Sequence, residues 1–489
     1  MHPPTTENGP ARRLAHLGWA LCECAADIEA GSMEKAGRCL SQAMGLAAAI
    51  GDGPLPRLAE PMAYCLARRL IRPMIPAVAD ALIDPSDHLD RRCVRAARRN
   101  FFKLSPFPKA AVAVANRVLL EAMENEKNVH VIDFAGPAAQ PCQWIQLLRD
   151  FHGRPEASPH LRLTIVHDDG EFLAKASASL ADEAYDLDVA LQVHCVAAKI
   201  EALDFNDLHG VLGLKSGEAR AIVCTLQLHR LLANAAGDDA GHHVNQTASV
   251  ARLQQMAAST SCPPSIIGGE AVLDDEADAA YRSPATPLGF ISPPLTTPPF
   301  QTPPALTAFL SAARAVVSPK IVVLAEQEAS HNGVSFRKRF AEALGYYAAV
   351  YDSLDAAAAA RRRPAADAER AEVERAVVGE EIRGVLLREG ARRRERHDRL
   401  QQWALRMEVA GFRKVPLSYD AMWQGNDVLG RCGVGGCESR EHAGCLLLCW
   451  RSCPLYSVSA WRPDRGGSAY GIGCISLMGE PRRAMNYAE

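Results

Sequence analysis

The sequence has neither a strong excess of one charge nor a long apolar run. Its 489 residues include 54 Lys and Arg against 57 Asp and Glu, a formal net charge of −3. A chain with this balance has no global attraction to nucleic acid, so any such contact must come from a local basic patch. No segment offers about 18 consecutive apolar residues, and the first residues lack the apolar part of a secretory signal. We therefore predict neither membrane insertion nor secretion.

The sequence also lacks the usual spacings of metal and catalytic sites. Its 15 cysteines are odd in number and scattered, which favours reduced thiols in the cytosol or nucleus over a disulfide framework. The last cysteines surround His442 at irregular spacings without a Cys-x-x-Cys pair: Cys432, Cys437, Cys445, Cys449 and Cys453. We predict no metal site, no cofactor and no catalytic residues, since no Ser/His/Asp or Cys/His set has a spacing typical of nucleophilic catalysis.

The segment Val129–Phe134 (VHVIDF) predicts a buried central strand. It is too short for an ordinary helix, and turn-forming residues follow it: Gly136, Pro137 and Pro141. Ligands of open parallel sheets bind at the carboxyl ends of the strands, where this segment places Asp133. Asp133 is therefore either a ligand contact or a buried cap of the next helix.

Strands and helices alternate through much of the chain. Such alternation is typical of βαβ units around a parallel sheet. Residues 445–450 and 455–461, joined by 451–454, predict a final antiparallel hairpin. Further strands are predicted at 161–167, 189–196, 221–226 and 320–326. The fold class is therefore α/β, a methyltransferase-like (Rossmann-type) mostly parallel sheet with a C-terminal antiparallel hairpin, plus an N-terminal all-helical cap.

The domain prediction follows the same patterns. Residues 1–13 are expected to be a disordered N-terminus, and residues 14–105 a leucine-rich helical cap. Residues 106–463 form the predicted α/β core. Within the core, residues 237–304 carry repeated Pro-Pro pairs and are expected to be a disordered insertion. The tail 464–489 has an atypical composition, and nothing is inferred from it.

Several ordered motifs resemble the plant GRAS family of transcriptional regulators, most closely its scarecrow-like 3 branch. The family's VHIID core is matched by Val129, His130, Val131, Ile132 and Asp133, followed by Gln143 and Trp144. Segments 14–100 and 172–232 resemble its two leucine-rich regions. Segments 336–355, 369–382 and 389–412 resemble its PFYRE block. The SAW block is matched by Trp450, Ser459, Ala460 and Trp461.

The resemblance implies a nuclear regulator of plant development and gibberellin signalling rather than an enzyme. It implies partners among zinc-finger-type DNA-binding transcription factors and other GRAS proteins, as a homo- or heterodimer, and direct DNA binding in some members. It also implies a helical cap on a methyltransferase-like core. The sequence departs from the family pattern at Ala135, where members usually carry Asp or Asn.

Two kinds of motif are candidates for binding partners. The arginine runs Arg361, Arg362, Arg363 and Arg392, Arg393, Arg394 can contact DNA phosphates or support nuclear import. The alternative is a solvated helix face with salt bridges. Leu228, Leu231 and Leu232 fit an LxxLL pattern that, on a helix, docks in a partner's groove. The alternative for these leucines is core packing.

Binding of S-adenosylmethionine, with or without methyl transfer, is the alternative function. Such a site needs a glycine-rich turn after the first strand and an acidic residue after the second. The turn Ala135–Pro141 has one glycine, whereas the second strand does supply Asp168 and Asp169. The glycine-poor turn favours a structural role, in which Asp133, Gln143 and Trp144 anchor the core to the helical cap.

Overall fold

The computed structural model describes residues 9–73, 75, 78, 90–154, 158–233 and 302–464. Most of the predicted insertion 237–304 and nearly all of the tail 464–489 lie outside these ranges. The prediction that residues 1–13 are disordered is wrong for residues 10–13, because helix α1 begins at Pro10, a favourable first residue of a helix. None of the helices in the described ranges combines the length and the apolar composition that a membrane span requires.

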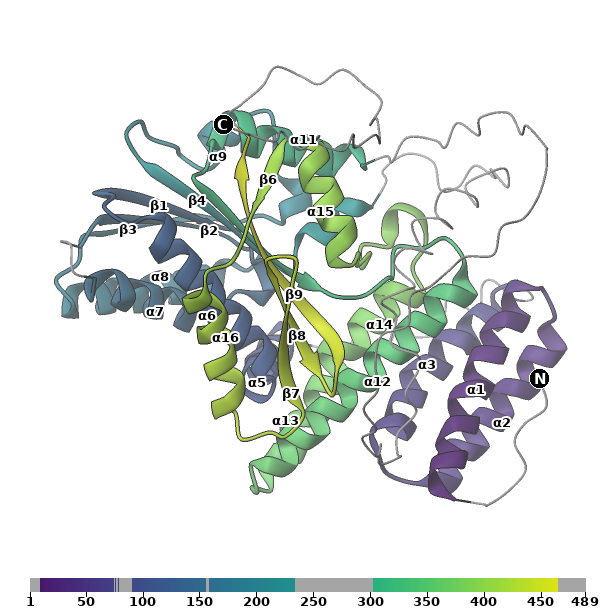
Figure 1. The fold of residues 1–489 in the computed structure, drawn as a ribbon. Helices are drawn as coiled ribbons and strands as arrows, with labels where there is room; N and C mark the ends of the chain where they lie inside the picture. Colours follow the sequence, from purple (N-terminus) through teal and green to yellow (C-terminus); the bar gives the residue numbers. More distant parts are fainter. Residues whose placement is uncertain are drawn as a thin grey trace, which may run out of the picture.

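In the described part of the chain, nine strands form one mixed sheet (Figure 1). The strands are β1 (Asn128–Asp133), β2 (His160–Val166), β3 (Leu191–Val196), β4 (Ala219–Thr225), β5 (Ile321–Gln327), β6 (Phe412–Val415), β7 (Cys437–His442), β8 (Cys445–Trp450) and β9 (Cys453–Pro463). The main order is β3-β2-β1-β4-β5-β9-β8-β7, and β6 pairs with β9. Strands β1 to β5 are parallel, and β9 joins β5 in the antiparallel direction. This arrangement confirms the predicted methyltransferase-like α/β fold.

Strand β1 lies at the centre of the parallel part, between β2 and β4. Its side chains alternate between two hydrophobic clusters, as the period of a strand requires. Val129 and Val131 belong to one cluster, and Ile132 to the other, together with Phe134 just beyond the strand. Burial on both faces explains why the segment is nearly continuously apolar.

Helices cover the sheet and connect its strands. In the core, α6 and α16 contact each other and α7 contacts α8. The core helices are α6 (Pro106–Ala122), α7 (Pro141–His152), α8 (Gly170–Asp186), α9 (Leu208–Val211), α11 (Pro304–Ala312), α15 (Leu400–Val409) and α16 (Tyr419–Arg431). Short turns are η1 (Gly136–Ala138), η2 (Ile200–Ala202), η3 (Leu228–Leu232) and the π-helical η4 (Ala313–Val317).

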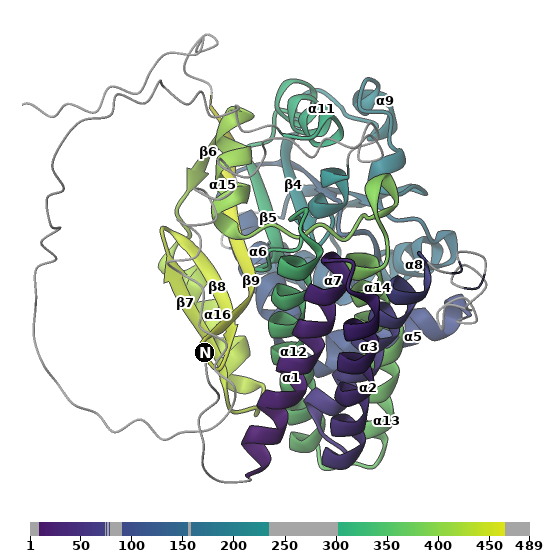
Figure 2. The same ribbon diagram turned by 90° about the vertical axis from the view of Figure 1, so that its right-hand side faces the viewer.

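The helical cap combines both halves of the sequence. Figures 1 and 2 show the three N-terminal helices standing beside α12, and α1 and α3 both contact α12. The helices are α1 (Pro10–Glu29), α2 (Met33–Ile50), α3 (Pro54–Ile71), α5 (Arg91–Leu104), α12 (Phe336–Ala360), α13 (Ala365–Val373) and α14 (Gly379–Leu386), with the turns η5 (Glu374–Val378) and η6 (Gly390–Arg392). Ion pairs support the packing, since Arg57 of α3 contacts Asp355 of α12 at 2.6 Å.

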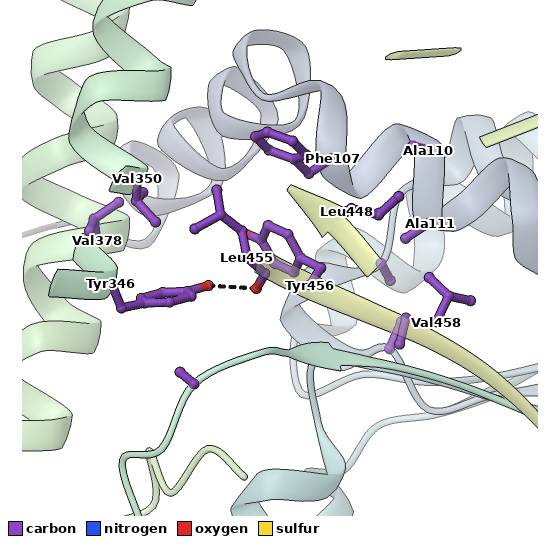
Figure 3. Close-up of a cluster of buried hydrophobic side chains, with 14 of the residues drawn as sticks. Phe107, Ala110, Ala111, Tyr346, Val350, Val378, Leu448, Leu455, Tyr456 and Val458 are labelled. Carbon is purple, nitrogen blue, oxygen red and sulfur yellow. Dashed lines mark hydrogen bonds between the residues drawn. The ribbon is translucent and has the colours of Figure 1, made fainter. Parts of the chain in front are cut away.

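Helix α12 is also fixed to the sheet, and this contact joins the cap to the core. The hydroxyl of Tyr346 donates to the carbonyl of Leu455 at 3.1 Å, next to Tyr456, which stacks on Phe107 (Figure 3). All four side chains are buried. The predicted hairpin therefore carries the cap contact, with its turn at Arg451 and Ser452 and with β9 beginning at Cys453.

Candidate functional site at the carboxyl ends of the parallel strands

Asp133 ends β1 and is almost fully buried, with 1% exposure. One carboxylate oxygen accepts the backbone N–H of Ala135 at 2.6 Å, and the other accepts the indole N–H of Trp144 at 2.7 Å. Burial raises the pKa of Asp133 to about 6, although both hydrogen bonds oppose the rise. The carboxylate thus connects the end of β1 to α7.

We predicted that Asp133, Gln143 and Trp144 anchor the core to the helical cap, but the structure shows them in contact with other parts of the core. Trp144 packs edge-on against Phe172 of α8, and the carbonyl of Gln143 accepts the side-chain amide of Asn116 on α6 at 3.1 Å. These partners belong to the α/β core. The motif therefore joins core elements to one another, because α7 packs against α6 and α8 rather than against the N-terminal helices.

Side chains of the protein occupy the two positions that a nucleoside cofactor would need. The backbone of Gly136 has φ 46°, and the side-chain oxygen of Gln227 lies only 2.8 Å from the place of a Cβ there. After β2, Asp169 caps α8 and pairs with Arg95 of α5 at 2.8 Å. The turn after the first strand and Asp169 after the second are thus engaged within the chain, whereas Asp168, the other acid predicted there, is 34% exposed and lies 3.9 Å from Lys199.

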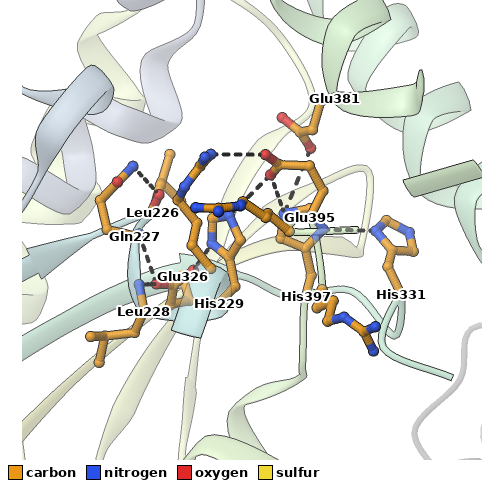
Figure 4. Close-up of polar contacts among 12 residues, drawn as sticks. Leu226, Gln227, Leu228, His229, Glu326, His331, Glu381, Glu395 and His397 are labelled. Atoms are coloured by element: carbon orange, nitrogen blue, oxygen red, sulfur yellow. Dashed lines mark hydrogen bonds and ion pairs between the residues drawn. The ribbon is translucent and has the colours of Figure 1, made fainter. Parts of the chain in front are cut away.

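A buried polar network lies at the carboxyl ends of β4 and β5 (Figure 4). Glu326, near the end of β5, is 1% exposed, and one of its oxygens accepts the backbone N–H groups of Gln227 and Leu228. Its other oxygen lies 2.9 Å from Nδ1 of His229, and Nε2 of His229 lies 3.0 Å from Glu395. His229 therefore bridges two carboxylates from distant parts of the sequence.

The network continues beyond Glu395. Arg230 donates to the second oxygen of Glu395 at 3.0 Å. The ring of His397 lies beside Glu395. Its Nδ1 lies 2.9 Å from Nδ1 of His331, and the backbone N–H of His331 donates to the carbonyl of His397. Glu381 of α14 accepts the hydroxyl of Tyr347 at 2.7 Å. Three segments far apart in the sequence thus meet at one edge of the sheet.

Opposite pKa shifts accompany this arrangement. Burial lowers the pKa of His229, but Glu326 and Glu395 outweigh it and raise the pKa to about 10. Burial likewise raises the pKa of Glu395, but the hydrogen bond and charge of His229 outweigh it and lower the pKa to about 2. Burial, with the charge of Glu395, raises the pKa of Glu381 to about 7. The pair His229–Glu395 is therefore an ion pair at neutral pH.

His130, the second residue of the VHIID-like motif, has a different environment. It is fully buried, with Nε2 2.8 Å from the hydroxyl of Thr164 and Nδ1 3.2 Å from Glu218. Burial, and then the charge of Arg162, lower its pKa to about 4. This histidine is a neutral structural residue of the sheet.

The predicted phosphate-binding arginines are separated by the structure. Arg361 ends α12 and donates to the carbonyl of Lys103, Arg362 is exposed, and Arg363 pairs with Glu369. In the second run, Arg392 is exposed and Arg394 pairs with Glu201. The prediction that Arg393 contacts phosphate is wrong, because Arg393 is 2% exposed and donates to the carbonyl of His331 at 2.8 Å.

The leucines of the LxxLL-like motif are part of the core. Leu228, Leu231 and Leu232 lie in the 3₁₀ turn η3 and are at most 1% exposed. The expectation that they offer an apolar helix face to a partner is therefore wrong for this conformation, and the core alternative holds. The motif matters for a different reason, since it places His229 and Arg230 in the polar network.

The SAW block packs as the last part of the sheet. Trp450 is buried and donates from its indole nitrogen to Asp352 of α12 at 2.7 Å. Trp461 is fully buried and donates to the hydroxyl of Ser459, and Ala460 is 1% exposed. These residues bind the hairpin to the core and to the cap, and the structure gives them no exposed surface.

Sequence reasoning missed the network around His229 altogether. Its members His229 and Glu395 are 166 residues apart, so no local spacing indicates them. One signal was available, because Glu326 is the last residue but one of a buried strand, much as Asp133 is the last residue of β1. A carboxylate at the end of an apolar run marks the ligand edge of a parallel sheet.

The fold and the filled strand ends define the class of the protein. It has a methyltransferase-like sheet whose carboxyl edge is covered by its own side chains, with a helical cap built from both halves of the sequence. The model of the GRAS domain family matches residues 17–462, so the chain belongs to the GRAS domain family.

Individual relatives agree with this assignment. Scarecrow-like protein 3 from Arabidopsis thaliana is 35% identical over 457 residues, covering 93% of this chain and 90% of the relative. GRAS family protein TF80 from Medicago truncatula is 32% identical over 442 residues, covering 90% and 94%. The crystal structure of SCL7 from Oryza sativa superposes with a TM-score of 0.64 at 25% identity, covering 91% of this chain and 99% of that one.

Proposed function

We propose that this protein regulates transcription in plant nuclei and acts through protein partners rather than by catalysis. The observation that carries the proposal is the GRAS match over residues 17–462, together with 35% identity to Scarecrow-like protein 3 across nearly the whole chain. We propose that it regulates development and gibberellin signalling, as the resemblance of its motifs to the scarecrow-like 3 branch implies. The partners we propose are zinc-finger-type DNA-binding transcription factors and other GRAS proteins, the latter as homo- or heterodimers.

The geometry of the strand ends supports a regulator over an enzyme. Gln227 lies against the turn after β1, and Arg95 neutralises the acid after β2. A methyltransferase needs both places for its cofactor. The polar groups at β4 and β5 are hydrogen-bonded to one another, which suits a rigid scaffold better than a pocket that must exchange substrates.

Localisation and reporter assays test the proposal. A fluorescent fusion expressed in plant cells is expected in the nucleus, and exclusion from the nucleus would contradict it. A promoter reporter that carries a zinc-finger factor's binding element is expected to respond when both proteins are expressed together. The matched control is the same reporter with that element mutated, which should not respond. A reporter unaffected by the chain would overturn the partner role.

Direct contact with DNA is a second candidate, favoured by the exposed arginines Arg362 and Arg363 at the end of α12. We expect labelled duplex DNA to bind more weakly at higher salt. The double variant Arg362→Glu/Arg363→Glu should weaken binding severalfold. The control Arg431→Glu/Arg440→Glu makes the same charge change at two other exposed positions. Equal affinities of both variants would assign Arg362 and Arg363 to a solvated face.

A further inference from the structure

We propose that His229, Glu395 and His397 form a binding site for one zinc ion. The donors are Nε2 of both histidines and a carboxylate oxygen of the glutamate, and these atoms lie within 4.8 Å of one another. Among the described residues they are the group of His, Cys, Asp and Glu side chains that converges closely enough to hold a metal. The proposal does not depend on the function proposed above.

An unpaired buried nitrogen points to a missing ligand. His397 is 1% exposed, and within the described ranges its Nε2 has no hydrogen-bond partner. The nearest acidic oxygens belong to Glu395 at 3.7 Å and Glu381 at 4.0 Å, both beyond hydrogen-bonding distance. Leaving such a group unsatisfied destabilises the folded protein, because the nitrogen has lost its hydrogen bonds to water. A metal bound at Nε2 removes this cost.

Contacts behind the three ligands resemble the support of natural zinc sites. Glu326 lies 2.9 Å from Nδ1 of His229, which leaves Nε2 to face the ion, as in carboxylate–histidine–zinc arrangements. His331 lies 2.9 Å from Nδ1 of His397 and orients that ring in the same way. Arg230 holds one oxygen of Glu395 and leaves the other facing the histidines.

The donor set favours zinc over calcium or magnesium. Two imidazoles and a carboxylate match zinc, whereas calcium and magnesium prefer oxygen ligands alone. Zinc at about 2.0–2.2 Å from each ligand places neighbouring ligand atoms roughly 3.3–3.6 Å apart. The distances from Glu395 to His229 and His397, 3.0 and 3.7 Å, are close to this spacing. Binding of zinc therefore needs small movements, which bring all three ligand atoms from their present separations of at most 4.8 Å to this spacing.

Glu381 offers a fourth ligand, because one of its oxygens lies 4.0 Å from Nε2 of His397. The side chains of Glu395 and Glu381 are 18% and 20% exposed, whereas those of the histidines are 4% and 1% exposed. An ion therefore reaches the carboxylates first. On binding, zinc takes the place of the proton on Nε2 of His229, which is released to solvent.

Metal analysis of the purified full-length chain tests the site. The protein is stripped with a chelator, its accessible thiols are blocked by alkylation, and zinc is added before gel filtration and mass-spectrometric metal analysis. We expect one zinc per chain for the wild type and none for His397→Gln. The control His130→Gln changes another buried histidine beside a glutamate, and we expect it to keep one zinc. Wild-type protein that retains no zinc would overturn the proposal.

A second variant and a spectrum guard against unfolding and against thiol binding. Glu395→Gln removes a different ligand, and circular dichroism identifies the folded variants. Cobalt added in place of zinc should give visible d–d bands with the wild type. The folded variants should lack these bands, and the spectra should not differ in any other way. A thiolate-to-cobalt charge-transfer band in the difference between these spectra would assign the metal to cysteines and overturn the site, as would equal zinc content in wild type and folded variants.

Discussion

Two buried histidines in the same sheet have opposite charge states. His130 lies on β1 with Nδ1 3.2 Å from Glu218, and His229 follows β4 with Nδ1 2.9 Å from Glu326. Burial lowers the pKa of His130, and Arg162 lowers it further, to about 4. Burial also lowers the pKa of His229, but Glu326 and Glu395 reverse the shift and raise it to about 10. Both histidines are buried and each has a glutamate near Nδ1, so these two features alone do not explain the difference in pKa.

The neighbours of each glutamate explain the difference. Glu218 also accepts two hydrogen bonds from Arg162, so its charge is shared with a permanent cation. Glu326 instead accepts two backbone N–H groups and meets His229 as its charged partner. His130 on β1 is therefore a neutral histidine beside an ion pair, whereas His229 at the carboxyl ends of β4 and β5 is itself part of a charged network.

Among the changes that test this comparison, removal of the Glu326 side chain should have the largest effect on the free energy of unfolding. Glu326→Ala leaves His229 with one carboxylate and two buried N–H groups without an acceptor. We expect the free energy of unfolding to fall by about 3–5 kcal/mol, the cost of breaking a buried ion pair. Urea unfolding in the presence of a chelator measures it. Glu438→Ala, at an exposed position of β7, should change the value by less than about 0.5 kcal/mol. Similar losses in both variants would contradict the account.

The pH dependence of His130 should give the next largest effect. A pKa near 4 in the folded state, against about 6.5 when unfolded, means that the unfolded chain binds more protons between these values. Stability is therefore fully present above pH 6.5 and is lost as the pH falls toward 4, by up to about 3 kcal/mol at about 1.4 kcal/mol per unit. Unfolding of wild type and His130→Gln over this range should show a steeper loss in the wild type. Parallel curves would contradict a neutral His130.

Loss of the indole hydrogen bond to Asp133 should have a smaller effect. Trp144→Phe keeps an aromatic ring in the core but leaves the buried carboxylate with one donor fewer, which should cost about 1–2 kcal/mol. Trp423→Phe is the matched control, because Trp423 is 50% exposed on α16. Chemical denaturation of both variants measures the difference. Equal midpoints would show that the hydrogen bond of Trp144 adds nothing to stability.

Most strands that the sequence predicted are buried on both faces, and the exception is β3, whose side chains are half-buried or exposed. VHVIDF, KIVVLAE and CLLLCW are continuous apolar runs bounded by turns, and each is a strand in the structure. Strand β7 (CESREH) and strand β6 (FRKV) were missed. β7 is polar and lies at the end of the strand order, and β6 has four residues. Neither carries a hydrophobic pattern strong enough to indicate it.

The segment 367–410 shows where charge misleads. Its density of Arg and Glu suggested a solvated helix around Arg392–Arg394. The structure instead has the π-helical turn η5, helix α14 and an irregular stretch from Arg393 to Arg399. Arg393 and Arg396 are buried there and donate to backbone carbonyls. The carbonyl that accepts from Arg393 is 62 residues away in the sequence, and a single sequence does not reveal such a partner.

The sequence indicated a structural role for Asp133 and Trp144, but it gave no sign of the distant contacts around His229. Asp133 and Trp144 are 11 residues apart, and their motif marks them as a structural pair. His229 and Glu395 meet only because β4, β5 and the segment after α14 end at the same edge of the sheet. Topology brings these side chains together, so the network becomes visible only in three dimensions.

The central claim is that the protein's own side chains fill the edge of the sheet where related folds bind a cofactor. Calorimetric titration of the purified chain with S-adenosylmethionine tests it most directly. The account predicts no saturable heat, because Gln227 lies against Gly136 and Arg95 neutralises Asp169. Saturable binding that is lost when Asp169 is replaced by Ala would contradict the account and favour a small-molecule-binding protein.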